Sequence, residues 1–495
     1  MLYFSLFSWM NDMGTVNTQS VREETDRLKL EFERLADSGK MSAEIKALFQ
    51  SMIMLVNLLV AIFLEKRTPK HQKNSSKPSS QTQKDESFVT QPGAKGKGKE
   101  ETSETVGNRR TIESVTVSKV SVCDVCGKDL GKLPCQGHER RTKIDIVFEK
   151  IVEHVDAQIK QCPECDTTVK GHFPLDMPGT LQYGPGLKAY VINLVVGQMI
   201  SLNRIQKLIK SMIGILIAEA TILKFVLRLY LALEAWEVNA VETLLKQTSL
   251  HVDETSLRVD KKNHWVHVYS AGEMTVKCLH RRRGTEAIDA INVIPRYSGV
   301  MIHDFWSSYL TYDHCVHGMC GAHIVRELTA IQEANGYQWA KNIKALLLET
   351  CKTVSRRRSK KLTPREYATL QRRYRNILTR GESELPPIPP KPNGRRGKMA
   401  KSDAHNLWER LKEYESAVLL FAQRSDVAFT NNRAERDLRM AKVKQKISGC
   451  FRNEIYAKAY CRISSYLQTM ANKGYNPLIA IQIALAGDFE HVGGE

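Results

Sequence analysis

The chain has 495 residues, of which 42% are hydrophobic, so it is long enough for several domains and suits a soluble globular protein. Its 73 lysines and arginines outnumber its 54 aspartates and glutamates, which gives a formal net charge of +19. This charge favours a polyanionic partner, most often a nucleic acid, although basic ribosomal and membrane-surface proteins also fit it.

The 11 cysteines and the amino-terminal sequence together indicate the redox environment. The apolar start MLYFSLFSWM lacks the basic region and the small-residue cleavage site of a secretory signal. We therefore expect reduced thiols, and we interpret close cysteine pairs as metal sites rather than disulfides.

Residues 19–65 are predicted to form a helical, leucine-zipper-like oligomerisation segment. Residues 47–64 are almost wholly apolar and near transmembrane length, but Gln50, Ser51 and Asn57 interrupt them. Apolar residues recur at alternating steps of three and four, at Ile45, Leu48, Met52, Leu55, Leu59 and Ile62. This heptad pattern favours a self-associating helix, and hence a homo-oligomer, over a membrane span.

Residues 66–112 are rich in Lys, Ser, Gln, Thr and Gly and nearly lack large apolar side chains. Such a segment cannot bury a core, so a basic flexible linker is predicted. Two roles stay open for it, non-specific contact with DNA phosphates and service as a solvated tether.

Residues 113–175 are predicted to be a zinc-binding module. Two Cys-x-x-Cys pairs are separated by 35 residues and supply four candidate ligands: Cys123, Cys126, Cys162 and Cys165. Two such pairs complete a tetrahedral site, and four protein ligands leave no open position, so the Zn²⁺ would be structural. The alternative is four unligated core cysteines. Three nearby residues offer substitute ligands: Cys135, His138 and His172.

Residues 176–247 are predicted to be a helical DNA-binding region, because apolar residues recur at steps of three and four. A helix-turn-helix DNA reader and generic helical packing both fit this pattern.

The periodicity changes near residue 249. SLHVDETSLRV, HWVHVYSAG and EMTVKCLH read as three successive strands, followed by a helix at 285–293 with Thr285 as its N-cap. GVMIHD and HCVHGMC read as two more strands, and GAHIVRELTAIQEA as a helix. This order predicts a ribonuclease H-like catalytic core at 248–335, with a helical insertion at 336–428 and closing helices at 429–495. The fold class is therefore multidomain α/β.

Three acidic residues occupy distinctive places in this order. Asp253 lies in the first strand, Asp304 ends the fourth, and Glu435 lies on a helix after the insertion. The first and fourth strands are neighbours in such a sheet, so the three carboxylates are expected to hold Mg²⁺ or Mn²⁺ for phosphodiester chemistry. Glu254 and Asp313 are nearby acids that can be confused with these ligands.

The helix that carries Glu435 is strongly basic. Side chains at four, seven and eleven residues from Glu435 share its face, which also includes Asn431; they are Arg439, Lys442 and Lys446. One interpretation is a metal ligand beside bound polyphosphate. The alternative is a solvated helix in which Glu435 pairs with Arg439.

Four blocks carry a resemblance to a known family: HVDETSLRV, HDFWSSY, CGAH and FTNNRAERDLRMAKVKQKISGCFR. They resemble the insertion-sequence-66 family of DDE transposases, and the resemblance extends over nearly the whole chain. It implies that Asp253, Asp304 and Glu435 are the catalytic triad. It also implies an amino-terminal zipper-like region and a zinc module, at the places predicted above.

The resemblance implies a DNA transposase that binds the terminal inverted repeats of its element and catalyses strand cleavage and strand transfer. Its partners would be element ends, target DNA and accessory proteins of the same element, in a bacterial, nucleoid-associated cytoplasmic setting. Five basic residues are expected to bind the phosphate backbone, with plain surface solvation as the alternative for each: Arg439, Lys442, Lys444, Lys446 and Arg452.

Three further residues are possible accessory residues of the site. His323, in the family's Cys-x-x-His element, contacts substrate or orders the site in one interpretation and is an inert core histidine in the other. Asn431 and Asn432 are expected to cap the Glu435 helix. Two other functions stay open: a regulatory zinc-dependent DNA-binding protein and a ribonuclease H-like nuclease.

Overall fold

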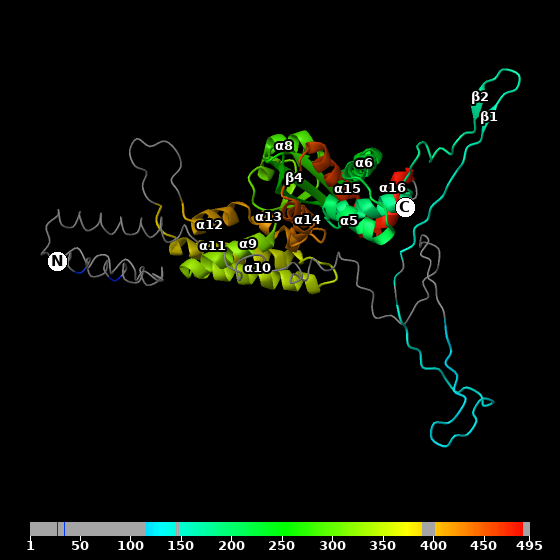
Figure 1. Cartoon of the computed structure of the whole chain (residues 1–495). Coiled ribbons are helices and arrows are strands. Elements are labelled where there is room, and N and C mark those ends of the chain that lie inside the picture. Colours follow the sequence, from blue (N-terminus) through cyan, green and yellow to red (C-terminus); the bar gives the residue numbers. More distant parts are fainter. Residues whose placement is uncertain are drawn as a thin grey trace, which may run out of the picture. The chain divides into compact units, whose positions relative to one another are not determined.

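The computed structural model describes residues 115–144, 146, 148–388 and 401–488, and the two single positions Arg27 and Arg34 (Figure 1). Apart from those two positions, the predicted zipper-like segment and the linker lie outside the described residues. The described residues form two compact units, which we call the sheet unit (233–388 and 401–474) and the second unit (115–232 and 475–488).

The sheet unit contains a mixed five-stranded sheet in the order β5-β4-β3-β6-β7. Strands β3, β4 and β5 pair antiparallel, whereas β6 runs parallel to both β3 and β7. The strand bounds are β3 Ser249–Val259, β4 Lys262–Ala271, β5 Met274–His280, β6 Val300–His303 and β7 Val316–Met319. The described chain is therefore mixed α/β, and this strand order is compatible with the predicted ribonuclease H-like core.

Local sequence explains the first hairpin. β3 and β4 are joined by Asp260 and Lys261, whose φ angles are 46° and 60°. Two consecutive positive φ values are typical of a type I′ turn, whose twist matches that of the flanking strands. The turn sets the register in which Asp253 lies opposite Val268.

β5 is an edge strand of the sheet, and its outer edge is covered by α15 (Glu454–Asn472). The Thr275 N–H donates to Thr469 Oγ1 at 3.1 Å, and the Lys277 N–H donates to Ser465 Oγ at 2.8 Å. These side-chain hydroxyls satisfy strand donors that would otherwise be unpaired at a sheet edge.

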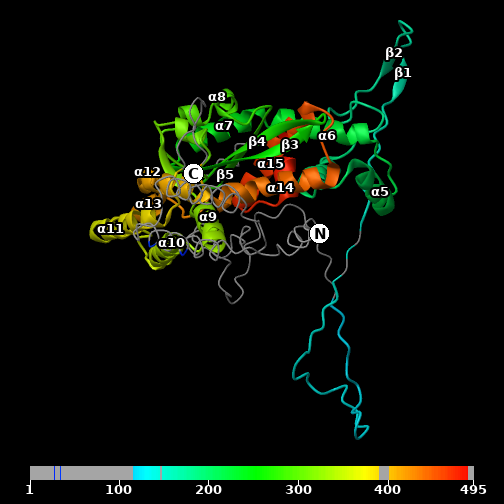
Figure 2. The ribbon, with the colours of Figure 1, turned by 90° about the vertical axis from the view of Figure 1, so that its left-hand side faces the viewer.

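Helices cover both faces of the sheet. α14 (Asn432–Ser448) packs on β3 and β4, while α7 (Glu234–Leu245) and α8 (Thr285–Ile291) lie on the other side of the strands (Figure 2). The predicted helix at 285–293 is confirmed, but Gly284 rather than Thr285 is its N-cap. Short 3₁₀ turns complete this part of the unit at η5 Ile294–Arg296 and η6 Tyr309–Thr311.

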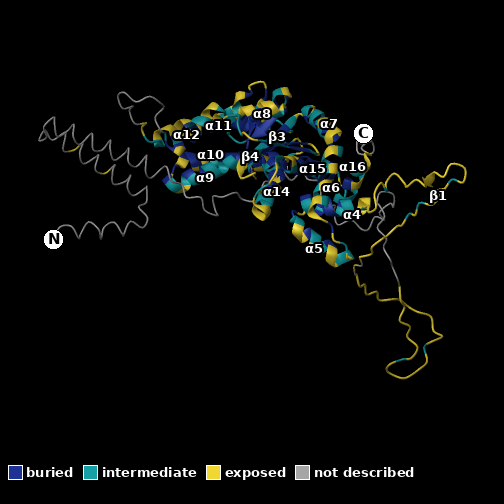
Figure 3. Ribbon diagram, turned by 45° about the horizontal axis from the view of Figure 1, so that its top comes forward, coloured by how far each residue is buried: buried dark blue, intermediate teal, exposed yellow. Residues whose placement is uncertain are grey.

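The region of the predicted insertion is helical where it is described. Its elements are α10 Gln338–Arg356, α11 Pro364–Gly381, η7 Glu382–Glu384, α12 Asp403–Glu413 and α13 Glu415–Gln423, and α9 Gly321–Asn335 directly precedes them at the end of the predicted core segment. Together with α9 they enclose an apolar core that includes residues of β6 and β7. Figure 3 shows the buried positions of these helices in dark blue. The Thr363 hydroxyl and the Glu366 carboxylate form a capping box at the start of α11, the local reason that this helix begins there.

The second unit combines a small hairpin with a helical cluster. Its elements are β1 Ile159–Gln161, β2 Thr168–Lys170, α4 Pro185–Ile192, the π-helical turn η4 Asn193–Gly197, α5 Leu202–Ile213, α6 Glu219–Ala232 and α16 Pro477–Ala486. α5 ends at Gly214, whose φ of 72° is left-handed. The DNA-reading role of these helices stays a prediction. Within the described residues, no helix is long and apolar enough to cross a membrane.

Candidate functional site

The parallel pairing of β3 and β6 sets two aspartates at one level of the sheet. Ser249 pairs with Val300 and His251 with Ile302, a constant offset of 51 residues. Extending that register by two residues brings Asp253 level with Asp304, which directly follows β6. Asp253 thus lies in β3 and Asp304 at the end of the neighbouring β6, as expected from their places in the sequence.

The third acid reaches the sheet through α14. Side chains alternate along a strand, so His251 and Asp253 share one face of β3. His251 Nδ1 lies 3.0 Å from Asn431 Oδ1, and the Asn431 side-chain amide donates to the Val252 carbonyl at 2.7 Å. These bonds fix the beginning of α14 over that face, and Glu435 lies in the first turn of the helix.

The predicted capping of this helix by asparagine is wrong for Asn431. Asn431 occupies the N-cap position, but its side chain makes no capping hydrogen bond. The side-chain amide bonds instead to His251 and to the Val252 carbonyl. These bonds attach the helix to a strand about 180 residues away in sequence.

The three carboxylates influence one another electrostatically. Burial raises the pKa of Asp253 well above its usual value, and the charges of Glu254, Asp304 and Glu435 raise it further. Burial also raises the pKa of Asp304 and of Glu435, and nearby arginines oppose both shifts. Carboxylates that destabilise each other's charged forms in a partly buried place form an environment that favours bound cations.

Of the neighbouring acids, Glu254 has other partners. The Arg283 guanidinium donates to Glu254 Oε1 at 2.6 and 2.8 Å, and the Tyr309 hydroxyl donates to Oε2 at 2.6 Å. Arg283 in turn lies over the rings of Trp265 and Trp306. Asp313 lies on an exposed turn. The ion pair and the hydrogen bond of Glu254 distinguish it from the three candidate ligands.

Glu435 is paired with α9 rather than with its own helix. Its Oε1 atom lies 3.5 Å from His323 Nδ1 and 3.7 Å from a terminal nitrogen of Arg326. Arg439, the partner expected for a plain surface helix, acts on the Glu435 carboxylate only as a weaker electrostatic influence. Arg326 was not among the predicted site residues, although it follows His323 by three residues on the same helical face, which was a usable signal.

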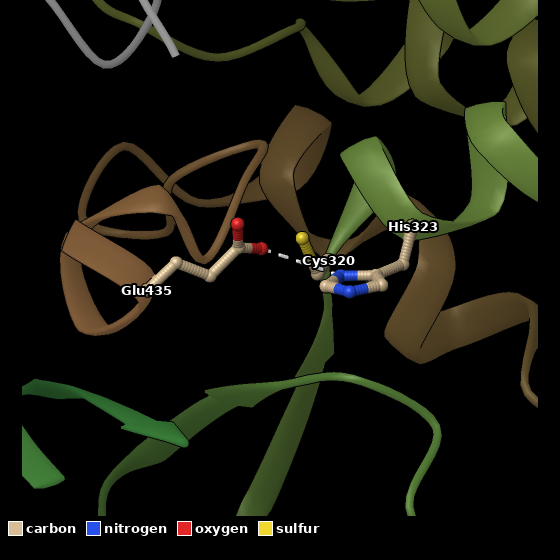
Figure 4. Close-up of side chains that lie close together, drawn as sticks. All are labelled: Cys320, His323 and Glu435. Atoms are coloured by element: carbon tan, nitrogen blue, oxygen red, sulfur yellow. Dashed lines mark ion pairs between the residues drawn. The ribbon is translucent and has the colours of Figure 1, made fainter. Parts of the chain in front are cut away.

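Among the described residues, one group brings three metal-ligating atoms together. Cys320, His323 and Glu435 each contribute one such atom, and all three atoms lie within 4.8 Å of one another. Figure 4 shows the His323 ring and the Glu435 carboxylate facing each other beside the Cys320 thiol. The ligand atoms of the predicted set, Asp253, Asp304 and Glu435, do not all lie within this distance of one another.

The basic residues after Glu435 are mostly accessible. Arg439, Lys442, Lys446 and Arg452 are exposed, whereas Lys444 is half-buried and its ammonium lies 6.0 Å from the centre of the Phe451 ring. Burial lowers the pKa of Lys444. The face around Glu435 is therefore positively charged, as the spacing predicted.

The predicted zinc ligands lie on two tight turns of the second unit. The Gly127 N–H donates to the Cys123 carbonyl at 2.9 Å, and the Asp166 N–H donates to the Cys162 carbonyl at 3.0 Å. Each turn brings its own pair of thiols together, and hydrogen bonds from the backbone of Cys126 and Val125 lower the pKa of Cys123. The structure does not gather the two pairs around one point, so the shared zinc site stays a prediction.

Comparison with known proteins identifies the family of the chain. No curated protein matches the sequence. The model of the Transposase IS66 family matches residues 180–459, more than half of the chain, and this range includes Asp253, Asp304 and Glu435 but not the two Cys-x-x-Cys pairs. The chain therefore belongs to the IS66 family of transposases.

Proposed function

We propose that this protein is the DNA strand-cleaving and strand-joining enzyme of a bacterial insertion sequence, with Asp253, Asp304 and Glu435 as its catalytic acids. The observation that carries the proposal is the convergence of these acids from β3, the end of β6 and α14, where the charges of Asp304 and Glu435 raise the pKa of Asp253 and the charge of Asp304 raises that of Glu435. The basic face of α14 beside them suits a polyanionic substrate.

The residues present fit Mg²⁺ or Mn²⁺, because hard divalent ions prefer carboxylate oxygens. When bound, such ions would activate the attacking oxygen and stabilise the leaving oxygen. Asp253 and Asp304 would hold them at the sheet, and Glu435 would complete the set from α14. Lys442, Lys446 and their neighbours would position the phosphate backbone without reading its sequence.

The proposed reaction has two phosphodiester steps. Water first attacks a phosphorus atom at the element end, and the bond to the 3′-oxygen breaks to leave a free 3′-hydroxyl. That hydroxyl then attacks a phosphorus atom of target DNA, the new phosphodiester joins element to target, and the displaced target 3′-oxygen takes up a proton. One bond forms for each bond broken, so no external energy source is required.

The same proposal assigns roles to the zinc module, to α5 and α6, and to the zipper-like segment. Zn²⁺ held by Cys123, Cys126, Cys162 and Cys165 would stabilise a small module structurally, and α5 with α6 would contact the terminal inverted repeats. The zipper-like segment would make the protein a homo-oligomer, which suits the pairing of two element ends. Action on the bacterial chromosome places the protein in the nucleoid.

The decisive experiment incubates the full chain with labelled DNA from the ends of its native element, target DNA and Mg²⁺. We expect joined products, and Glu435→Gln should reduce cleavage by on the order of 10²–10⁴-fold, because it removes a ligand of the cation that stabilises the transition state. Glu286→Gln is the matched control, since Glu286 lies on the exposed surface of α8.

The possible results separate three functions. Joined products support the transposase, cleavage without joining identifies a nuclease, and binding without cleavage identifies a regulator. Cleavage by Glu435→Gln at the rate of the unaltered chain would remove Glu435 from the catalytic set.

A further inference from the structure

Cys320, His323 and Glu435 form a compact ligand set where two helices begin. Cys320 is the N-cap of α9, His323 lies in the first turn of α9, and Glu435 lies in the first turn of α14. Their ligand atoms lie within 4.8 Å of one another (Figure 4). Phosphodiester chemistry at hard divalent ions has no need of the thiol or the imidazole, so the function proposed above does not explain this set.

Two atoms of the set are buried without a hydrogen-bond partner. These atoms are His323 Nδ1 and Glu435 Oε1, which lie 3.5 Å apart. Two ligands at about 2.0–2.1 Å from a tetrahedral zinc ion lie about 3.4 Å from each other. The separation of the pair is thus already close to that of two zinc ligands, and a buried acceptor that lacks a hydrogen bond is costly unless something binds it.

The chemistry of the donors selects the class of metal. Thiolate and imidazole ligands suit Zn²⁺ and similar transition-metal ions, whereas Mg²⁺ takes oxygen ligands. A thiolate and a carboxylate together also neutralise the two charges of Zn²⁺. The Cys320 sulfur accepts the Asn431 N–H at 3.1 Å, and this bond holds the sulfur in place at the N-terminus of α9.

We propose that Cys320, His323 and Glu435 bind Zn²⁺ or a similar transition-metal ion at a site separate from the four-cysteine module, and that this ion withdraws Glu435 from Asp253 and Asp304. The binding part stands on the ligand geometry alone. The second part rests on the proposed function, because it predicts that zinc inhibits DNA cleavage. Three protein ligands leave the fourth coordination position of the ion open.

The guanidinium of Arg326 competes for the same oxygen. Its guanidinium lies 3.7 Å from Glu435 Oε1, and its side chain is 28% exposed. Zinc binding therefore requires this guanidinium to turn toward solvent, where it regains hydration. The Glu435 carboxylate would therefore pair either with the singly charged Arg326 guanidinium or with the doubly charged metal ion.

The binding test uses the full chain, stripped of metal with a chelator and then titrated with Zn²⁺, or with Co²⁺ to detect thiolate-to-cobalt charge-transfer absorption. We expect Cys320→Ser and His323→Gln each to weaken one binding event ~10-fold or more, because each loses a direct ligand. Cys315→Ser is the matched control, since Cys315 is also a buried thiol but donates to the Tyr297 carbonyl.

A third cysteine variant distinguishes the proposed four-cysteine site from the Cys320 site. Cys126→Ser should remove a different binding event and leave the Cys320-dependent event in place. Equal stoichiometry and affinity in the unaltered chain, Cys320→Ser and His323→Gln would overturn the site. His323→Gln, at a half-exposed position, keeps the test valid if the buried Cys320 variant does not fold.

The inhibition test compares cleavage in Mg²⁺ with and without added Zn²⁺ for each variant. The unaltered chain and Cys315→Ser should lose cleavage about tenfold with zinc, whereas Cys320→Ser should show a ratio near one. Zinc bound through Cys320 without any loss of cleavage would overturn the withdrawal of Glu435. Absence of cleavage in every condition would instead overturn the proposed function and leave the binding result intact.

Discussion

Two acidic side chains of α14 lie two residues apart in opposite environments. Glu435 is half-buried and faces His323 and Arg326. Asp437 is 3% exposed, and its Oδ2 atom accepts the Ser270 hydroxyl at 2.7 Å and the Thr275 hydroxyl at 2.9 Å. The first acid belongs to the candidate site, and the second attaches the helix to β4 and β5.

Replacement of Asp437 should therefore affect stability. We expect Asp437→Ala to lower the free energy of unfolding by about 3–5 kcal/mol, because it leaves two buried hydroxyls without their acceptor and the buried Lys277 without a counter-charge. Urea denaturation measures the change. Met440→Ala, at an exposed position of the same helix, should be nearly neutral, and an equal effect of both variants would contradict the anchoring role.

At the scale of elements, α9 and α14 are connected where both begin. The Gly321 N–H donates to the Phe429 carbonyl at 2.8 Å, and the Asn431 N–H donates to Cys320 Sγ at 3.1 Å. A Cβ atom at Gly321 would meet the Phe429 ring at 2.4 Å. Glycine at this position lets the segment before α14 approach closely enough to bring Glu435 to His323.

A methyl group at that contact should separate the two helices. We expect Gly321→Ala to destabilise the sheet unit by about 1–3 kcal/mol, because overpacking forces the Phe429 ring to move. Thermal unfolding measures the loss. Gly284→Ala is the control, since its added Cβ meets only Ser308 Oγ at 3.8 Å; a Gly321→Ala protein as stable as this control would show that the ring yields freely.

Element types and order were predictable where the periodicity was strong. The five strands follow the predicted order, and α9 begins at the Gly321 expected for it. The cover of the β5 edge by α15 was not predictable, because Ser465 and Thr469 give no sign in sequence of bonding to strand amides nearly 200 residues away. The start of α8 was misplaced by one residue, because Thr285 is a good cap by type while Gly284 has the extended conformation of one.

For the whole molecule, the net charge of +19 predicts that the affinity for DNA depends on salt concentration. Each lysine that neutralises a phosphate releases a counterion and makes binding more dependent on salt. The exposed Lys442 and Lys446 on α14 are the residues that we expect to act in this way.

Loss of these two lysines should flatten the salt dependence of DNA binding. We expect Lys442→Gln with Lys446→Gln to reduce the slope of log affinity against log salt by about 1.8, or about 0.9 for each contact. Fluorescence anisotropy over a salt series measures the slope. Lys352→Gln, an exposed position on α10, should leave it unchanged; equal slopes for the double variant and the unaltered chain would place the DNA elsewhere.

Residue types and their spacing were enough to predict the order of strands and helices, the three candidate acids, the basic face of α14 and the family resemblance, because these depend on single elements and their order. Three features came only from the tertiary structure: the exact register of β3 and β6 that brings Asp253 level with Asp304, the meeting of Glu435 with Cys320 and His323, and the attachment of α14 by Asp437. Such contacts join residues far apart in the chain. They are set by how strands register and how closely helices pack, and no local pattern in the sequence records either quantity.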